Sequence, residues 1–163
     1  MIDASFLTFD DNVTLQFDRV IAAAPMDVWA ALTEPAELAK WLADAEFDVS
    51  VGGAVHLVWP GSGEMRGTVQ ECNVPSLLEY TWDESDGSSL VRWEVASSGD
   101  GQSTLRLVHS GVSKDGAAGF GAGWQSHLEA LDVVMSGGSS DQAQRDGRYE
   151  ELHPKYLDAV AEL

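Results

Sequence analysis

Alternating apolar and polar residues mark a series of short strands along the chain. Val91, Trp93 and Val95 alternate with Arg92 and Glu94, a period of two that is typical of a strand with one buried and one solvated face. Short turns rich in Gly, Pro, Ser and Asp, such as 85–88 and 98–101, separate these segments and indicate antiparallel pairing, because parallel crossovers need longer connections. The pattern predicts strands at 14–21, 46–51, 54–59, 64–73, 77–83, 89–96 and 104–109. The first ten residues fit an edge strand or a loose arm.

Four other segments carry apolar residues at spacings of three and four, which predicts helices. Two short helices are expected near 25–33 and 36–42, where Pro25 and Pro35 suit a first helical turn. A long helix is expected over 120–135, and it ends at Gly137 and Gly138. After a polar linker over 139–147, a last amphipathic helix is expected from Arg148 to the C-terminus.

The order of these elements predicts an α+β protein with its helices gathered on one face of an antiparallel sheet. We expect one domain over residues 1–138, and a linker with an additional C-terminal helix over residues 139–163. The apolar residues of that helix would pack on the domain or, alternatively, on the partner in a homodimer: Leu152, Tyr156, Val160 and Leu163.

Several motifs occur in a fixed order along the chain. They are Ala24-Pro25-x-x-Val28-Trp29-x-Ala31-Leu32-Thr33-x-Pro35, Leu38-x-x-Trp41-Leu42, Gly52-Gly53, Gly67-Thr68-Val69, Pro75-x-x-Leu78-x-Tyr80-x-Trp82, Thr104-Leu105-x-Leu107-x-His109-Ser110-Gly111 and Gly123-Trp124-x-x-His127-Leu128. Together, over about residues 17–138, they resemble the heat-shock ATPase activator (AHSA) homologue family of the START and birch-pollen-allergen (SRPBCC) superfamily. The resemblance implies a helix-grip fold, in which a curved antiparallel sheet of about six to seven strands wraps around a long C-terminal helix. It also implies a cavity between sheet and helix for a small apolar molecule.

The charge of the chain excludes several classes of partner. Its 163 residues include 27 acidic and 9 basic side chains, a formal net charge of −18. This balance argues against nucleic acid, which clustered Lys and Arg bind, and against anionic membrane surfaces. The single Cys72 excludes an intramolecular disulfide and a multi-cysteine zinc site. With no basic signal sequence and no metal-ligand spacing among the four histidines, we expect a cytoplasmic protein without metal or cofactor.

The tryptophans are the second unusual feature, since they make up six of the aromatic residues. Large rings on inward-facing positions serve either as core or as the wall of a ligand pocket. The candidate ligand-binding residues are those on predicted inward positions near the cavity: Trp29, Trp41, Tyr80, Trp82, Trp93, Leu107, His109, Phe120, Trp124 and His127.

Two of these residues, His109 and His127, are also the candidates for catalysis. Both could reach one cavity and act there as acid or base, or orient a polar group of a ligand. The alternative is that each is a core histidine satisfied by hydrogen bonds. The glycine-rich segment 116–123 is interpreted as a flexible hinge before the long helix, because a phosphate-binding loop would need a following Lys-Ser/Thr pair.

Three hypotheses for the function follow. The first is a START-like domain that binds a small hydrophobic ligand in the cavity without catalysis. The second is an enzyme of the cyclase, aromatase or hydrolase type that uses the same cavity with His109 or His127. The third is a stress- or chaperone-linked interaction module that presents an acidic surface.

Overall fold

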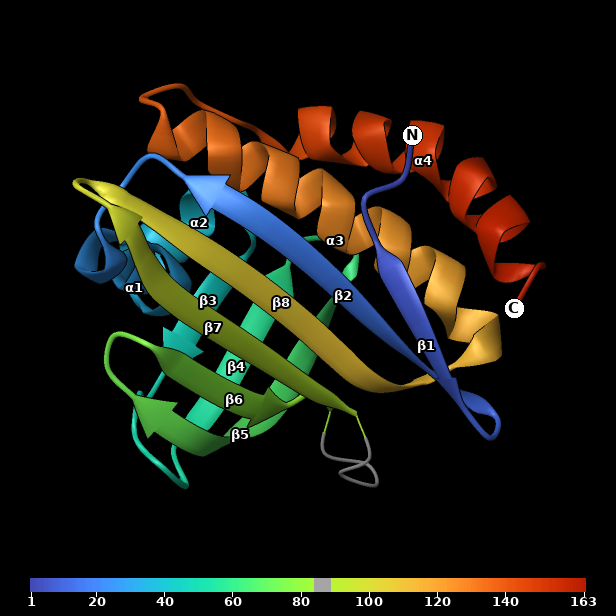
Figure 1. Cartoon of the computed structure of the whole chain (residues 1–163), viewed down its shortest axis with the longest axis horizontal. Helices are drawn as coiled ribbons and strands as arrows, with labels where there is room; N and C mark the ends of the chain where they lie inside the picture. The colour runs from blue at the N-terminus through green and yellow to red at the C-terminus, as the bar shows by residue number, and fades with distance from the viewer. Residues whose placement is uncertain (84–88) are drawn as a thin grey trace.

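A computed structural model gives the fold of the chain and describes residues 1–83 and 89–163. Within these ranges it contains eight strands and four helices (Figure 1). The predicted turn at 85–88 lies outside the described residues. In chain order the elements are β1 (Ser5–Phe9), β2 (Asn12–Ile21), α1 (Pro25–Thr33), α2 (Pro35–Trp41), β3 (Asp44–Phe47), β4 (Ala54–Trp59), β5 (Gly63–Asn73), β6 (Leu77–Thr81), β7 (Leu90–Gly99), β8 (Gln102–Ser113), α3 (Lys114–Met135) and α4 (Gln142–Val160).

The described strands form one antiparallel sheet in the order β1-β2-β8-β7-β6-β5-β4-β3. Strand register aligns the inward-facing residues into rows that cross the sheet. Phe17 on β2 lies opposite Leu107 on β8, which lies opposite Trp93 on β7, and Trp93 lies opposite Leu78 on β6. All four side chains are buried, so the alternation seen in the sequence builds one continuous apolar face.

The long helix α3 covers this apolar face, while α1 and α2 gather at one end of the sheet (Figure 1). Small residues of α3 bring the helix close to the strands, since Ala117, Ala118 and Ala122 are buried. Leu128 and Leu131 complete the buried side of the helix. This arrangement confirms the α+β helix-grip fold, with eight strands where six to seven were expected.

The additional strand is β1, formed by the N-terminal segment. Ser5–Phe9 pair antiparallel with the first half of β2, so this segment is an edge strand and not a loose arm. The arm before it is also held, because the Gln125 side-chain carbonyl accepts a hydrogen bond from the backbone N–H of Asp3 at 3.0 Å. The N-terminus is thereby attached to α3.

The long helix begins earlier than the sequence pattern indicates, so the predicted glycine hinge is wrong. Ser113 caps the helix by accepting a hydrogen bond from the Gly116 N–H at 3.1 Å, and the glycines that follow are helical. Helix packing explains why one of these positions is a glycine, since a Cβ at Gly121 would overlap the ring of Tyr156 on α4. Glycine therefore lets the two helices approach closely.

The final helix also begins earlier, at Gln142, so most of the predicted linker is helical. Asp141 and Gln144 form a capping box, with the Asp141 carboxylate accepting from the Gln144 N–H at 2.8 Å and the Gln144 side chain accepting from the Asp141 N–H at 3.0 Å. The helix packs along α3 of the same chain. Leu152, Tyr156 and Val160 are buried there, whereas Leu163, which was expected to pack with them, lies beyond the end of the helix and is exposed. Three of the four apolar residues are therefore covered within the protein.

Candidate functional site

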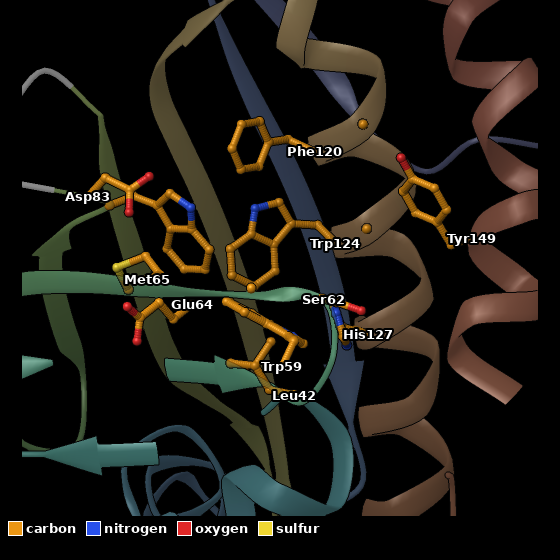
Figure 2. Close-up of a pocket in the computed structure, with 14 residues that line it drawn as sticks. Leu42, Trp59, Ser62, Glu64, Met65, Asp83, Phe120, Trp124, His127 and Tyr149 are labelled. Carbon is orange, nitrogen blue, oxygen red and sulfur yellow. The ribbon is translucent and has the colours of Figure 1, made fainter. Parts of the chain in front are cut away.

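A pocket of about 420 Å³ opens between the β4–β5 hairpin, the end of β6 and the first half of α3. Its volume lies in the range of roughly 300–1,000 Å³ typical of small-molecule sites. Figure 2 shows Phe120 and Trp124 projecting from α3 into the space that Trp59 and Met65 border from the strands. The lining residues are Leu42, Trp59, Ser62, Gly63, Glu64, Met65, Trp82, Asp83, Gly119, Phe120, Gly123, Trp124, His127 and Tyr149.

Helical periodicity explains why α3 supplies so much of the lining. Positions 119, 120, 123, 124 and 127 recur at spacings of three and four, which places them on one face of the helix. Two of these positions are glycines that leave room beside the aromatic rings. A Cβ at Gly123 would have no atom within 4 Å, so the missing side chain is part of the open space.

Aromatic rings from β4, from α3 and from the residue just after β6 form the walls. The ring of Trp82, just after β6, lies 5.1 Å from that of Trp124, 6.0 Å from that of Trp59 and 6.4 Å from that of Phe120, measured between centroids. Such edge and tilted contacts stabilise the cluster by about 0.5–1.5 kcal/mol per pair beyond area burial. The walls are therefore built from rings that hold one another in place.

His127 lies at the inner side of this pocket, and one of its ring nitrogens is already used. Nδ1 lies 3.0 Å from the backbone carbonyl oxygen of Trp41. Because a carbonyl oxygen can only accept, Nδ1 carries the proton and Nε2 carries the lone pair of the neutral ring. Burial is the main cause that lowers the pKa of His127 to about 4, so the ring is neutral at pH 7.

His109 lies behind the aromatic wall and does not line the pocket. Its Nδ1 accepts a hydrogen bond from the Trp124 indole N–H at 2.9 Å, and its Nε2 lies 2.7 Å from the Ser89 hydroxyl. Both nitrogens are thus used, and burial lowers the pKa of His109 to about 3. Its ring lies 5.5 Å from that of Trp82, 4.8 Å from that of Phe120 and 6.1 Å from that of Trp124, measured between centroids. It therefore supports three pocket residues from behind.

The candidate ligand-binding residues divide into two groups. Trp82, Phe120, Trp124 and His127 line the pocket. The others lie in the closed core: Trp29, Trp41, Tyr80, Trp93 and Leu107, together with His109. There, for example, Trp93 donates its indole N–H to the Tyr80 hydroxyl at 3.1 Å and packs edge-on against Trp41 at 6.0 Å.

Several lining residues are absent from the candidates predicted from the sequence. Trp59 ends β4 just before Pro60, where strand parity no longer indicates a direction. Gly119 and Gly123 were detectable in principle, because they share the helix face of Phe120, Trp124 and His127. Tyr149 comes from α4, and no pattern in the sequence links that helix to this face of α3.

The charged groups of the pocket are acidic. Glu64 and Asp83 line it and are exposed at its mouth, and no Lys or Arg is among the lining residues in the described part of the chain. The exposed Arg66, outside the lining, lies 3.9 Å from Glu64. Glu64 bonds to the imidazole of His56 at 2.7 Å, and this hydrogen bond is the main cause that lowers the pKa of its carboxyl group.

Over residues 1–83 and 89–163 no three His, Cys, Asp or Glu side chains lie close enough together to hold a metal ion. None of the helices in these ranges has the length and hydropathy needed to span a membrane.

Comparison with solved structures gives the same fold in bacterial proteins. A conserved protein of unknown function from Enterococcus faecalis is 20% identical, with 98% of this chain and 91% of that chain covered and a TM-score of 0.81. CalU16 from Micromonospora echinospora is 21% identical, with 99% and 98% covered and a TM-score of 0.75. The Aha1 dimer from Colwellia psychrerythraea is 18% identical, with 75% and 95% covered and a TM-score of 0.68. At these identities the likeness concerns the fold alone.

Family membership follows from the sequence match itself. Among curated proteins none matches the chain. The model of the family described as Activator of Hsp90 ATPase homolog 1-like protein, however, matches residues 22–136, which is most of the chain and includes the motifs from Ala24 to His127. The resemblance noted in the sequence is thereby confirmed, and the chain belongs to the Activator of Hsp90 ATPase homolog 1-like family.

Proposed function

We propose that this protein binds a small, largely apolar molecule in the pocket between the sheet and α3. The observation that carries the proposal is an open space of about 420 Å³ walled by Trp59, Trp82, Phe120 and Trp124. Trp82 and Trp124 are buried and Trp59 and Phe120 are half-buried, and all four rings border a space large enough for a ligand. Apolar walls with a few polar groups are the usual composition of small-molecule sites.

The geometry favours binding over acid–base catalysis. A two-histidine mechanism needs both imidazoles at the substrate, and His109 is separated from the pocket with hydrogen bonds at both nitrogens. His127 has one nitrogen bound to the Trp41 carbonyl, and its low pKa leaves it a weak base near neutral pH. The ring is better suited to accept a hydrogen bond from a ligand than to move a proton.

Filling the pocket provides a test that does not damage the fold. In Gly123→Leu the new side chain enters open space and replaces a helical glycine by a better helix former, which stabilises a helix by up to about 1 kcal/mol. We expect the variant to remain folded and to lose binding of prodan, a neutral naphthalene fluorophore whose emission reports an apolar site. Fluorescence titration of wild type and variant measures this.

Gly147→Leu is the matched control. Gly147 is a helical, exposed glycine on α4, with no atom within 4 Å of a Cβ and outside the pocket lining. The control should bind prodan as the wild type does. Equal binding by Gly123→Leu and wild type would place the probe elsewhere and contradict the proposal, as would the absence of saturable binding in all three proteins.

A second candidate function is association with an Hsp90-type ATPase, and the observation that favours it is the family match over residues 22–136. The test is the ATPase rate of the Hsp90-type chaperone from the same organism, with and without this protein. Saturable stimulation would support the association. An unchanged rate, together with independent sedimentation of the two proteins, would contradict it.

A further inference from the structure

The polar groups of the pocket point to a class of ligand, an inference that rests on the proposed binding function. We propose that the pocket selects neutral aromatic molecules that carry a hydroxyl group over their unsubstituted, O-methylated and carboxylated counterparts, with the hydroxyl donating a hydrogen bond to Nε2 of His127.

The acceptor is fixed by a bond on the far side of the ring. Nδ1 of His127 donates to the Trp41 carbonyl oxygen at 3.0 Å, and no hydrogen-bond partner of Nε2 is found among residues 1–83 and 89–163. In the neutral ring Nε2 can only accept. A ligand that brings an O–H group satisfies this atom, whereas an ether or a hydrocarbon in the same place leaves it unpaired.

Trp41, whose backbone carbonyl accepts the hydrogen bond from His127, is held firmly in the core. Trp41 is fully buried, and its indole N–H donates to the Ala31 carbonyl at 2.9 Å. Its ring also packs edge-on against Trp93 at 6.0 Å. The carbonyl that orients His127 is therefore held by the core, so Nε2 is preorganised before a ligand arrives.

Charge at the mouth opposes acidic ligands. Glu64 and Asp83 lie among the lining residues, and the lining within the described part of the chain includes no Lys or Arg. The hydrogen bond from His56 favours the ionised form of Glu64, and the exposed Arg66, outside the lining, lies 3.9 Å from it and offsets only part of this charge. The whole chain has a formal charge of −18. A ligand carboxylate would meet like charges, which cost free energy in a partly desolvated site.

The remaining polar groups of the pocket suit a ligand hydroxyl, which can donate and accept, better than a ligand group that can only donate a hydrogen bond. Indole N–H groups of Trp59 and Trp82 can only donate, and the hydroxyls of Ser62 and Tyr149 can donate or accept. A ligand hydroxyl both donates and accepts. The surrounding rings, with Trp82 and Trp124 at 5.1 Å between centroids, offer edges and faces on which a flat aromatic body packs.

The test compares four ligands that share one ring system: naphthalene, 2-naphthol, 2-methoxynaphthalene and 2-naphthoate. Isothermal titration calorimetry at pH 7 measures each against the wild type. We expect 2-naphthol to bind about tenfold more tightly than 2-methoxynaphthalene, the effect of one satisfied acceptor, and 2-naphthoate to bind weakest.

Two variants assign the preference to His127. In His127→Asn an amide can still donate to the Trp41 carbonyl, but no acceptor remains at the position of Nε2, so 2-naphthol and 2-methoxynaphthalene should bind equally. His153→Asn removes a histidine of α4 that stacks on the outer lining residue Tyr149 at 5.3 Å but does not itself line the pocket, and it should keep the preference. Circular dichroism checks that both variants fold, and the comparison in the wild type needs no variant.

The outcomes separate the two proposals. Equal wild-type affinities for 2-naphthol and 2-methoxynaphthalene, or tightest binding of 2-naphthoate, would overturn the ligand class while leaving the pocket as a binding site. A hydroxyl preference that survives in His127→Asn would overturn the role of His127. If none of the four ligands binds saturably, the proposed binding function itself fails.

Discussion

His109 and His127 each have a ring nitrogen fixed by a neighbouring group, and the two rings are fixed in opposite ways. The Trp124 indole can only donate, so Nδ1 of His109 accepts and Nε2 carries the proton. The Trp41 carbonyl can only accept, so Nδ1 of His127 carries the proton. One histidine therefore supports the pocket wall, and the other lines the pocket with an Nε2 that has no hydrogen-bond partner among the described residues.

This difference predicts two neutral rings in opposite tautomers. Because burial lowers the pKa of His109 to about 3 and that of His127 to about 4, both should remain neutral at pH 5.5. Long-range ¹⁵N–¹H correlation spectra should show the Nε2–H form for His109 and the Nδ1–H form for His127. The same tautomer in both rings, or a charged ring at pH 5.5, would contradict this assignment.

The sequence could predict the direction of a pocket residue but not the space beside it. Strand parity predicts that the side chains of Trp82 and Trp93 point toward the interior, and both are buried. Trp93 is enclosed by Trp41 and Tyr80, whereas Trp82 borders the pocket. Whether a ring is enclosed depends on which element packs next to it, and this is a property of the folded chain.

At the scale of elements, the glycines of α3 have different roles. Gly121 faces α4, where a Cβ would lie 2.4 Å from the Tyr156 ring, whereas a Cβ at Gly123 would meet no atom within 4 Å. The Tyr156 ring cannot move aside easily, because it is fully buried and its hydroxyl donates to Gln125 at 2.6 Å. The first glycine thus allows helix packing, and the second leaves room in the pocket.

Alanine substitutions at these two glycines should change stability in opposite directions. Gly121→Ala should lower the free energy of unfolding by about 1–3 kcal/mol, the usual cost of overpacking. Gly123→Ala should raise it by about 0.5–1 kcal/mol, the gain in helix propensity. Urea denaturation measures both. A stabilising Gly121→Ala variant would show that α3 and α4 are not in close contact there.

The elements that the sequence pattern missed share a physical cause. A glycine-rich segment lacks the apolar periodicity by which a helix is detected, so the first turns of α3 were interpreted as a hinge. The first turns of α4 lack it as well, since their buried residue is Arg145. Alternation did identify the central strands, because β6 to β8 have one buried and one solvated face.

At the scale of the whole molecule, the excess of acid allows some cations to pair with several carboxylates at once, as Arg92 does. Arg92 on β7 lies 3.0 Å from Glu71, 3.4 Å from Glu79 and 3.7 Å from Glu94. Exposed pairs of this kind contribute little stability individually. Above about pH 5, the change in the free energy of unfolding with pH should therefore depend mainly on the two buried histidines, His109 and His127.

We predict that the free energy of unfolding decreases as the pH falls from 7 to 5. The folded-state pKa values of His109 and His127 lie below the ordinary value of 6.5, so the unfolded chain takes up protons that the folded chain does not. Each histidine should contribute a decrease of up to about 1.4 kcal/mol per pH unit below 6.5. Urea denaturation at pH 7, 6 and 5 measures the slope.

The His127→Asn variant is the control for this slope. Removing one of the two buried imidazoles should make the dependence on pH about half as steep, while most carboxyl groups remain ionised in this range. A free energy of unfolding that is constant between pH 7 and 5 in the wild type would contradict the placement of two neutral, buried histidines.

A crystal structure of the protein grown with 2-naphthol would show whether the pocket holds a hydroxylated aromatic ligand. We predict density for the naphthalene ring between Trp59, Trp82 and Trp124, with its oxygen within hydrogen-bond distance of Nε2 of His127. A pocket that contains only ordered water at saturating 2-naphthol, or ligand density confined to another surface, would contradict ligand binding in this pocket.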